Sequence, residues 1–242
     1  MASRALVEWF KTGEDPWMDQ GDAIELLHSS HPRTIFVKSL RRHAALLDVG
    51  AGNGSLNTLK HWPKPERRDL KIYAYAMEKG EGFEACDGYE VGTWPDQKPK
   101  FNGMQFDGIL ASHFIEHIPE PVDFVAWCAN RLASGGRLYI EWPSDNSVGL
   151  PPRQTFHAND IPIVISDFYD DHTHRKLPQR DGVLKAMTKK GLSIDQQGVI
   201  SNPFIEQEVL AHFREGRRDE FMLQSAYWSK TKWAQYVIAS KP

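Results

Sequence analysis

Residues 44–54 read AALLDVGAGNG, an apolar run that leads directly into three closely spaced glycines. A short apolar run that ends at glycine is typical of a β-strand buried on both faces. The spacing of Gly50, Gly52 and Gly54 predicts a turn whose backbone N–H groups approach a bound molecule. A tight turn without a ligand is the alternative, but three glycines at one turn cost backbone entropy, which disfavours it. The pattern therefore predicts an open α/β sheet with a ligand at the end of this strand.

Segments typical of strands and of helices alternate along the chain. Helices are predicted within residues 3–10, 21–30, 33–42, 55–62, 121–133 and 182–191, and strands within residues 44–50, 71–78, 89–94, 106–112, 137–143, 192–200 and 234–242. Such alternation implies parallel strands joined by right-handed crossovers. We therefore expect an α/β protein with a doubly wound, mostly parallel seven-stranded sheet. Helices over residues 1–43 precede the main domain, 44–242, in which the polar segment 144–180 is expected to form a lid after the fifth strand.

Composition and charge exclude several classes of protein. The 242 residues are 40 % hydrophobic and 25 % charged, which is ordinary for a globular chain. The net charge of −3 disfavours a dedicated nucleic-acid binder, because such proteins usually carry a basic excess. Two cysteines are too few for a disulfide framework, and the N-terminal residues lack the apolar run of a signal peptide. With no segment of transmembrane length, we expect a cytoplasmic protein.

Two acidic residues distinguish between the cofactors that a glycine turn can serve. The dinucleotide fingerprint needs glycine or alanine at position 55, where this chain has Ser55. A carboxylate at Asp48 would repel a pyrophosphate but would favour a ligand with an ammonium or sulfonium charge. Glu78 ends the second predicted strand, where a carboxylate can accept hydrogen bonds from both ribose hydroxyls. An adenosine that carries a cationic amino-acid arm satisfies both carboxylates, and S-adenosylmethionine is such a ligand.

The segments LLDVGAGNGSL, YAMEKG, FDGILASHFIEHIPEP and RLASGGRLYIEWP, in this order, resemble the class I S-adenosylmethionine-dependent methyltransferases. The resemblance covers residues 44–143 and implies an enzyme with a Rossmann-like methyltransferase fold. The residues that it assigns to the cofactor site are Asp48, Gly50, Ala51, Gly52, Gly54, Glu78, Ala111 and Ser112. The residue that contacts the adenine stays open between Asp87 and Trp94.

Residues 113–117 read HFIEH, which matches the inverted zinc-protease motif H-x-x-E-H. That motif requires a stable helix, and the nearby Pro119 disfavours one. Within the resembled class, small-RNA 2′-O-methyltransferases and ubiquinone-pathway O-methyltransferases bind a divalent metal through the pattern E-x-x-E-H. Glu116 and His117 match this pattern, whereas His113 replaces its first glutamate.

A second group of histidines follows the fifth predicted strand. Residues 168–176, FYDDHTHRK, resemble the D-x-T-H element of bacterial methyltransferases associated with surface-polysaccharide and glycan genes. An exposed turn is the alternative, because Asp, His and Thr favour turns. Either His172 or His174 would join Glu116 and His117 around the metal, and His174 is the one that we assign.

The resemblance implies that the chain transfers a methyl group from S-adenosylmethionine to a hydroxyl of a small-molecule or glycan acceptor, with sugar O-methylation preferred. The hydroxyl must lose its proton, and the candidate bases are His117, His113 and His174, in that order. Coordination to a metal would also lower the pKa of the hydroxyl. Two other functions stay open. A nucleic-acid 2′-O-methyltransferase is disfavoured by the near-neutral charge, and a non-catalytic S-adenosylmethionine-binding partner protein is disfavoured by the candidate bases.

Overall fold

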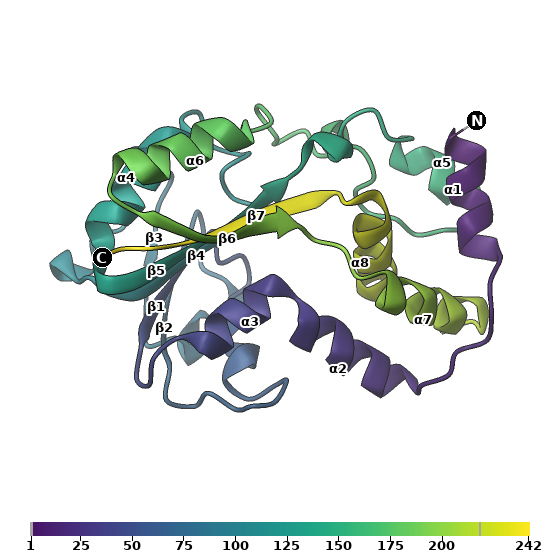
Figure 1. The fold of residues 1–242 in the computed structure, drawn as a ribbon, viewed down its shortest axis with the longest axis horizontal. Helices are drawn as coiled ribbons and strands as arrows, with labels where there is room; N and C mark the ends of the chain where they lie inside the picture. Colours follow the sequence, from purple (N-terminus) through teal and green to yellow (C-terminus); the bar gives the residue numbers. More distant parts are fainter. Residues whose placement is uncertain (1, 218) are drawn as a thin grey trace. The chain divides into compact units, whose positions relative to one another are not determined.

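The computed structural model describes residues 2–217 and 219–242 (Figure 1). The helices are α1 (Ala2–Lys11), α2 (Gln20–Ser30), α3 (Pro32–Ser39), α4 (Pro121–Arg131), α5 (Arg153–His157), α6 (Arg180–Lys189), α7 (Pro203–Arg214) and α8 (Glu220–Thr231). The strands are β1 (Ala45–Val49), β2 (Lys71–Ala76), β3 (Gly88–Val91), β4 (Phe106–Ser112), β5 (Leu132–Pro143), β6 (Ser193–Val199) and β7 (Ala234–Ser240). Short 3-10 helices include η1 (Ser55–Lys60) and η2 (Glu81–Ala85).

The strands form one seven-stranded sheet in the order β3-β2-β1-β4-β5-β7-β6. The pairs β1–β2, β1–β4, β2–β3 and β4–β5 are parallel. β7 is antiparallel to β5, because the N–H of Gly135 near the start of β5 donates to the carbonyl of Lys241 just after β7. The sheet therefore confirms the predicted mostly parallel, Rossmann-like fold. The strand order reverses between β1 and β4, so the carboxyl ends of these two strands are where this fold binds ligands.

The described chain divides into two compact units, each made of three segments. Unit 1 comprises Met1–His31, Pro143–His174 and Val199–Gln235, and unit 2 comprises Pro32–Trp142, Arg175–Gly198 and Tyr236–Pro242. This division differs from the predicted boundaries. Of the N-terminal helices, α1 and α2 belong to unit 1, whereas α3 belongs with the sheet. The predicted lid, 144–180, is divided at residue 174, and α7 and α8, for which no helix was predicted, complete unit 1.

In unit 2, helices cover both faces of the sheet (Figure 1). On one face α4 and α6 pack over a core that includes Leu47 and Ile109. On the other face α3 and η1 pack over Leu46 and Leu110. Leu46 and Leu47 are both fully buried although they point to opposite faces, which explains the continuous apolar run of β1.

In unit 1, the helices share an apolar core of their own. Phe10 of α1 lies 6.1 Å from the ring of Tyr227 of α8 and 5.9 Å from the ring of Phe156 of α5. α7 and α8, which were not predicted, have side-chain caps. Asn202 accepts from the N–H of Ile205 at the start of α7. Asp219 caps α8 in the same way. Local capping and a shared core therefore account for both helices.

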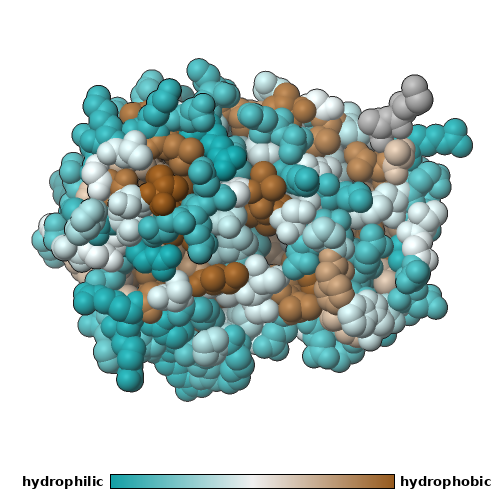
Figure 2. Space-filling view, viewed as in Figure 1, coloured by the Kyte–Doolittle hydropathy of each residue, from teal (hydrophilic) through white to brown (hydrophobic). Residues whose placement is uncertain are grey.

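The described part of the chain contains no helix with the length and apolar character needed to cross a membrane. On the face drawn in Figure 2, hydrophilic residues predominate and hydrophobic residues form small separate groups.

Candidate active site

The glycine turn leaves the carboxyl end of β1 and is held against the end of β2. The N–H groups of Gly50 and Ala51 donate to the carbonyl oxygen of Tyr75 at 2.9 and 3.1 Å. Gly52 has a φ of +52°, in the left-handed region that favours glycine. A Cβ atom added to Gly52 would meet no described atom within 4 Å, so the space before this residue is open to a ligand.

The segment after β2 lies directly against the glycine turn. A Cβ atom on Gly80 would lie 2.4 Å from the carbonyl oxygen of Gly52, so only glycine fits at position 80. The N–H of Gly82 donates to the carbonyl of Asn53 at 2.8 Å. Glu78 lies between β2 and this contact, and its side chain is exposed. The structure therefore places Glu78 beside the turn, where the sequence predicts the ribose contact.

Asp48 lies in β1 and is almost completely buried. Burial raises the pKa of its carboxyl to about 7, and the positive charge of Arg33 partly opposes this effect. In the parallel pairing of β1 with β4, Val49 lies opposite Ala111. Ala111 and Ser112 therefore end β4 next to the glycine turn. The residues predicted to bind the cofactor thus meet at one edge of the sheet.

The two candidates for the adenine contact both have structural partners. Asp87 accepts from the N–H of Ile72 and from Nζ of Lys60, each at 2.9 Å. Trp94 is buried and packs edge-on against Phe124, with ring centroids 5.3 Å apart. Asp87 is exposed but already engaged, and Trp94 is buried, so the adenine contact stays unassigned.

His113 follows the end of β4 and lies between two buried carboxylates. Its Nδ1 is 3.1 Å from Oε1 of Glu116, and its Nε2 is 2.9 Å from Oε1 of Glu141. Burial lowers the pKa of His113, but the hydrogen bonds and charges of Glu116 and Glu141 outweigh burial and raise it to about 9. A positively charged imidazole with both nitrogens engaged cannot accept a proton near neutral pH. This geometry disfavours His113 as a base and gives it the task of orienting Glu116.

The backbone at HFIEH forms turns rather than a helix. His113 has a φ of +51°, an uncommon value for a residue other than glycine. The strained turn brings Glu116 inward, where the residue is fully buried. Its Oε2 atom has no hydrogen-bond partner within the described ranges 2–217 and 219–242. A buried carboxylate oxygen without a hydrogen bond lowers the stability of the fold, and a bound ligand would offset this cost.

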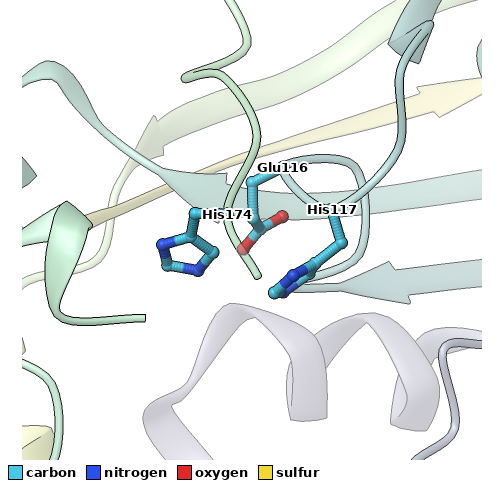
Figure 3. A group of neighbouring side chains, drawn as sticks. All are labelled: Glu116, His117 and His174. Carbon is cyan, nitrogen blue, oxygen red and sulfur yellow. The ribbon is translucent and has the colours of Figure 1, made fainter. Parts of the chain in front are cut away.

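Glu116, His117 and His174 each offer one ligand atom, and these atoms lie within 4.8 Å of one another. Figure 3 shows the two imidazoles on either side of the Glu116 carboxylate. His174 is peptide-bonded to Arg175, whose N–H donates to the carbonyl oxygen of Glu116 at 2.9 Å, so the backbone itself holds this part of the chain beside Glu116. A carboxylate with two imidazoles is a donor set suited to a divalent metal.

The environment of His174 suits a metal ligand. Its Nδ1 lies 2.5 Å from the carbonyl oxygen of Phe168, and its ring stacks on the ring of Phe168. Donation from Nδ1–H to a carbonyl places the ring's lone pair on Nε2, the arrangement usual in metal-binding histidines. His172, the alternative that the sequence left open, is exposed and does not belong to the group of ligand atoms.

Four residues at this edge were not predicted from the sequence. Arg33 of α3 donates from Nη1 to Oγ of Ser112 at 3.0 Å. Tyr139 and Glu141 of β5 form a buried pair, in which the tyrosine hydroxyl donates to Oε2 of the glutamate at 2.5 Å. Phe114 packs against Gly50, since its Cδ2 would lie 2.9 Å from a Cβ atom there. Of these, only Phe114 lies within a recognised motif; the others become site residues through pairings distant in sequence.

A family model described as a methyltransferase domain matches residues 23–197, which is more than half of the chain. The chain belongs to this family of class I S-adenosylmethionine-dependent methyltransferases. This assignment confirms the predicted family and cofactor.

Curated relatives carry the name ubiquinone biosynthesis O-methyltransferase. The protein of that name from Xanthomonas oryzae pv. oryzae (strain PXO99A) is 27 % identical over 131 residues, which are 51 % of this chain and 54 % of the relative. The one from Nitrosococcus oceani is 26 % identical over 140 residues, 51 % of this chain and 55 % of the relative. The chain therefore spans about half the length of the curated relatives it matches.

Solved structures share the fold of this methyltransferase-family chain at low sequence identity. Geranyl diphosphate C-methyltransferase from Streptomyces coelicolor A3(2) has a TM-score of 0.55 and 12 % identity, over 87 % of this chain and 75 % of its own. A SAM-dependent methyltransferase from Archaeoglobus fulgidus has a TM-score of 0.51 and 15 % identity, over 92 % and 100 %. The cyclase SpnF has a TM-score of 0.51 and 17 % identity, over 96 % and 84 %. Since a cyclase is among them, these likenesses establish the fold and not the reaction.

Proposed function

We propose that this chain transfers the methyl group of S-adenosylmethionine to a hydroxyl of a small-molecule acceptor that presents two neighbouring oxygens. The observation that carries this proposal is the buried carboxylate of Glu116, whose Oε2 has no hydrogen-bond partner among the described residues and which lies beside His117 and His174. Family membership supports the cofactor, and the curated relatives that are named O-methyltransferases support oxygen as the methylated atom.

The residues at the carboxyl ends of β1 and β2 suit the cofactor. The open space before Gly52 can receive the methionine arm, and the buried carboxylate of Asp48 can face its ammonium group. The exposed carboxylate of Glu78 can accept hydrogen bonds from the ribose. Because the methyl carbon of a sulfonium is already electrophilic, the main tasks of the protein are in-line alignment and exclusion of water.

The residues after β4 suit the acceptor. A divalent metal, when bound by Glu116, His117 and His174, would lower the pKa of an acceptor hydroxyl and orient its neighbouring oxygen. His113 orients Glu116 through the bond to Oε1. The mixture of carboxylate and imidazole favours manganese, cobalt or zinc over magnesium, which prefers oxygen ligands. His117 is half-buried and serves as the proton acceptor if no metal is bound.

Two adjacent hydroxyls occur on sugars and on aromatic rings, so the proposal includes both. The D-x-T-H element around His174 favours a glycan acceptor by resemblance, whereas the names of the curated relatives favour a ubiquinone precursor. The net charge of −3 gives no support to a nucleic-acid acceptor.

The test measures binding and turnover separately. Calorimetry with S-adenosylmethionine, S-adenosylhomocysteine and NAD should show binding of the first two only. Transfer of labelled methyl groups to panels of sugar diols and aromatic diols then identifies the acceptor. A chelator and Glu116→Ala should each suppress transfer strongly and leave S-adenosylhomocysteine affinity nearly unchanged, because the metal holds the acceptor. Glu120→Ala, at an exposed carboxylate four residues later, is the matched control.

One result would contradict the methyltransferase reaction, and another would contradict only the metal site. Binding of NAD with no response to S-adenosylmethionine would remove the methyltransferase assignment for this chain. Activity that survives both exhaustive chelation and Glu116→Ala would remove only the metal and leave His117 as the base.

A further inference from the structure

Glu141 of β5 lies directly beside the turn that carries Glu116. In the parallel pairing of β4 with β5, Glu141 lies opposite Ser112, the residue just before His113. The carbonyl oxygen of Glu141 accepts from the backbone N–H of His113 at 2.9 Å. Oε1 of its side chain lies 2.9 Å from Nε2 of the His113 ring. The backbone and the side chain of Glu141 therefore both hold His113 at the end of β4.

The second oxygen of Glu141 is fixed by Tyr139. The two residues lie two apart in β5, so their side chains point to the same face of the sheet. The hydroxyl of Tyr139 donates to Oε2 of Glu141 at 2.5 Å, and both side chains are buried. Burial and the charge of Glu141 raise the pKa of Tyr139 well above its usual range, so the hydroxyl keeps its proton and donates. This bond leaves Oε1 of Glu141 for the contact with His113.

Tyr139 is itself held by aromatic packing on the sheet. Its ring centroid lies 5.4 Å from that of Phe36 in α3 and 6.0 Å from that of Tyr236 in β7, with the latter two rings stacked. The three residues belong to, or pack against, one apolar core. The position of the Tyr139 hydroxyl is therefore set by the core of the sheet.

His113 connects Glu141 to Glu116. Its other ring nitrogen, Nδ1, lies 3.1 Å from Oε1 of Glu116. That contact engages one oxygen of the fully buried Glu116, whereas Oε2 has no hydrogen-bond partner among the residues that the structure describes. An imidazole can keep the carboxylate in this orientation only if its own ring is held. Groups behind a metal ligand commonly do this and are needed for full metal affinity.

We propose that Glu141, held by Tyr139, is a positioning residue for the metal site: it fixes the His113 ring, which in turn directs Oε2 of Glu116 to the metal. This inference rests on the proposed function, because it concerns how the proposed metal ligand Glu116 is oriented. Tyr139 and Glu141 affect the metal affinity through His113 and not by coordination.

The experiment measures the affinity for Mn²⁺ alone by calorimetry on the full chain. Glu141→Gln keeps the shape and removes the charge, and it should bind Mn²⁺ about tenfold to a hundredfold more weakly than wild type, the usual effect of changing a group behind a metal ligand. Tyr139→Phe removes only the hydroxyl and should weaken Mn²⁺ binding by a smaller factor. Both variants should bind S-adenosylhomocysteine nearly as wild type does, because neither residue belongs to the proposed cofactor site.

A double-mutant cycle separates positioning from a general loss of stability. His113→Asn removes the connection between Glu141 and Glu116. In that background Glu141→Gln should weaken Mn²⁺ binding no further, because the two residues act in one chain of contacts. A purely structural role would give losses that add. Thermal unfolding of the four proteins records any change in stability separately.

Glu206→Gln is the matched control. Glu206 of α7 is buried as completely as Glu141 and likewise accepts from a hydroxyl, that of Ser229, at 2.6 Å. The same substitution there should leave the Mn²⁺ affinity unchanged.

Each contrary result has one meaning. Wild-type Mn²⁺ affinity in Glu141→Gln, or in Tyr139→Phe if Glu141→Gln does not fold, overturns the inference and leaves the metal site standing. An effect of Glu141→Gln that is equally large with and without the His113 side chain overturns it as well. A wild-type protein that binds no Mn²⁺ contradicts the metal site of the proposed function and overturns the inference with it.

Discussion

Asp48 is a buried residue whose environment disfavours its charged form. Its carboxyl is buried, and burial raises its pKa from the usual 3.8 to about 7, although Arg33 opposes the change. A carboxyl whose pKa is higher in the folded than in the unfolded state binds its proton more tightly when folded. Stability is therefore lost as the pH rises from about 4 toward 7, and the full loss is present above pH 7. A bound ammonium group beside Asp48 would restore part of the lost stability.

Asp48→Asn removes the charge and keeps the shape. We expect the ligand-free variant to have a larger free energy of unfolding than wild type at pH 8, by on the order of a few kcal/mol, and therefore a higher unfolding temperature. The advantage should shrink as the pH falls toward 4. The same variant should bind S-adenosylmethionine more weakly at pH 8. Thermal unfolding and calorimetry across this range measure both effects, and a variant less stable than wild type at every pH would contradict the account.

At this scale the sequence predicts the residues whose role is local. Asp48 and the glycines lie together in one short segment, so their pattern is readable without the fold. Arg33 and Ser112 are 79 residues apart, and the link between His113 and Glu141 also joins different elements. These two contacts form only once the chain has folded and brought the elements that carry them together. In the sequence, nothing distinguishes Glu141 from the other residues of its predicted strand.

Among the elements, the glycine turn has the most constrained geometry. Gly52 and Gly103 share a left-handed backbone, and a Cβ atom on either would meet no described atom within 4 Å. Gly52→Ala and Gly103→Ala should therefore each lose about 1–2 kcal/mol of stability from backbone strain. Only Gly52→Ala should weaken S-adenosylhomocysteine binding, because its methyl group enters the space proposed for the methionine arm. Chemical denaturation and calorimetry on the pair test this, and equal affinities would place the methionine arm elsewhere.

The elements around HFIEH and beyond β6 show why some predictions succeed and others do not. Pro119 and Pro121 correctly indicate that HFIEH is not a helix, because proline acts on the local backbone. The helices α7 and α8 were not predicted, although Asn202 and Asp219 cap them. Glu206 and Glu208 of α7 are buried, so the polar residues of this helix do not mark a solvent-exposed face.

At the scale of the whole molecule, both units are discontinuous in sequence. The three segments of unit 1 are separated by segments of unit 2, so no cut in the chain divides the units. The sequence predicted continuous domains because it shows local patterns and not contacts between distant segments. The proposed cofactor residues, which include Asp48, Gly52, Glu78 and Ser112, all lie in unit 2. Cofactor binding and the core of unit 1 can therefore be perturbed separately.

Phe10→Ala tests this separation. Phe10 is 1 % exposed and packs with Phe156 and Tyr227 in the core of unit 1, so its truncation should cost about 3–5 kcal/mol. Hydrogen exchange should show lost protection in α7 and α8 and retained protection in β1 and β4, with S-adenosylhomocysteine affinity unchanged. Phe10→Leu, which conserves more volume, should have a smaller effect of the same pattern. Equal loss of protection in β1 and β4 would mean that the two units unfold as one cooperative body.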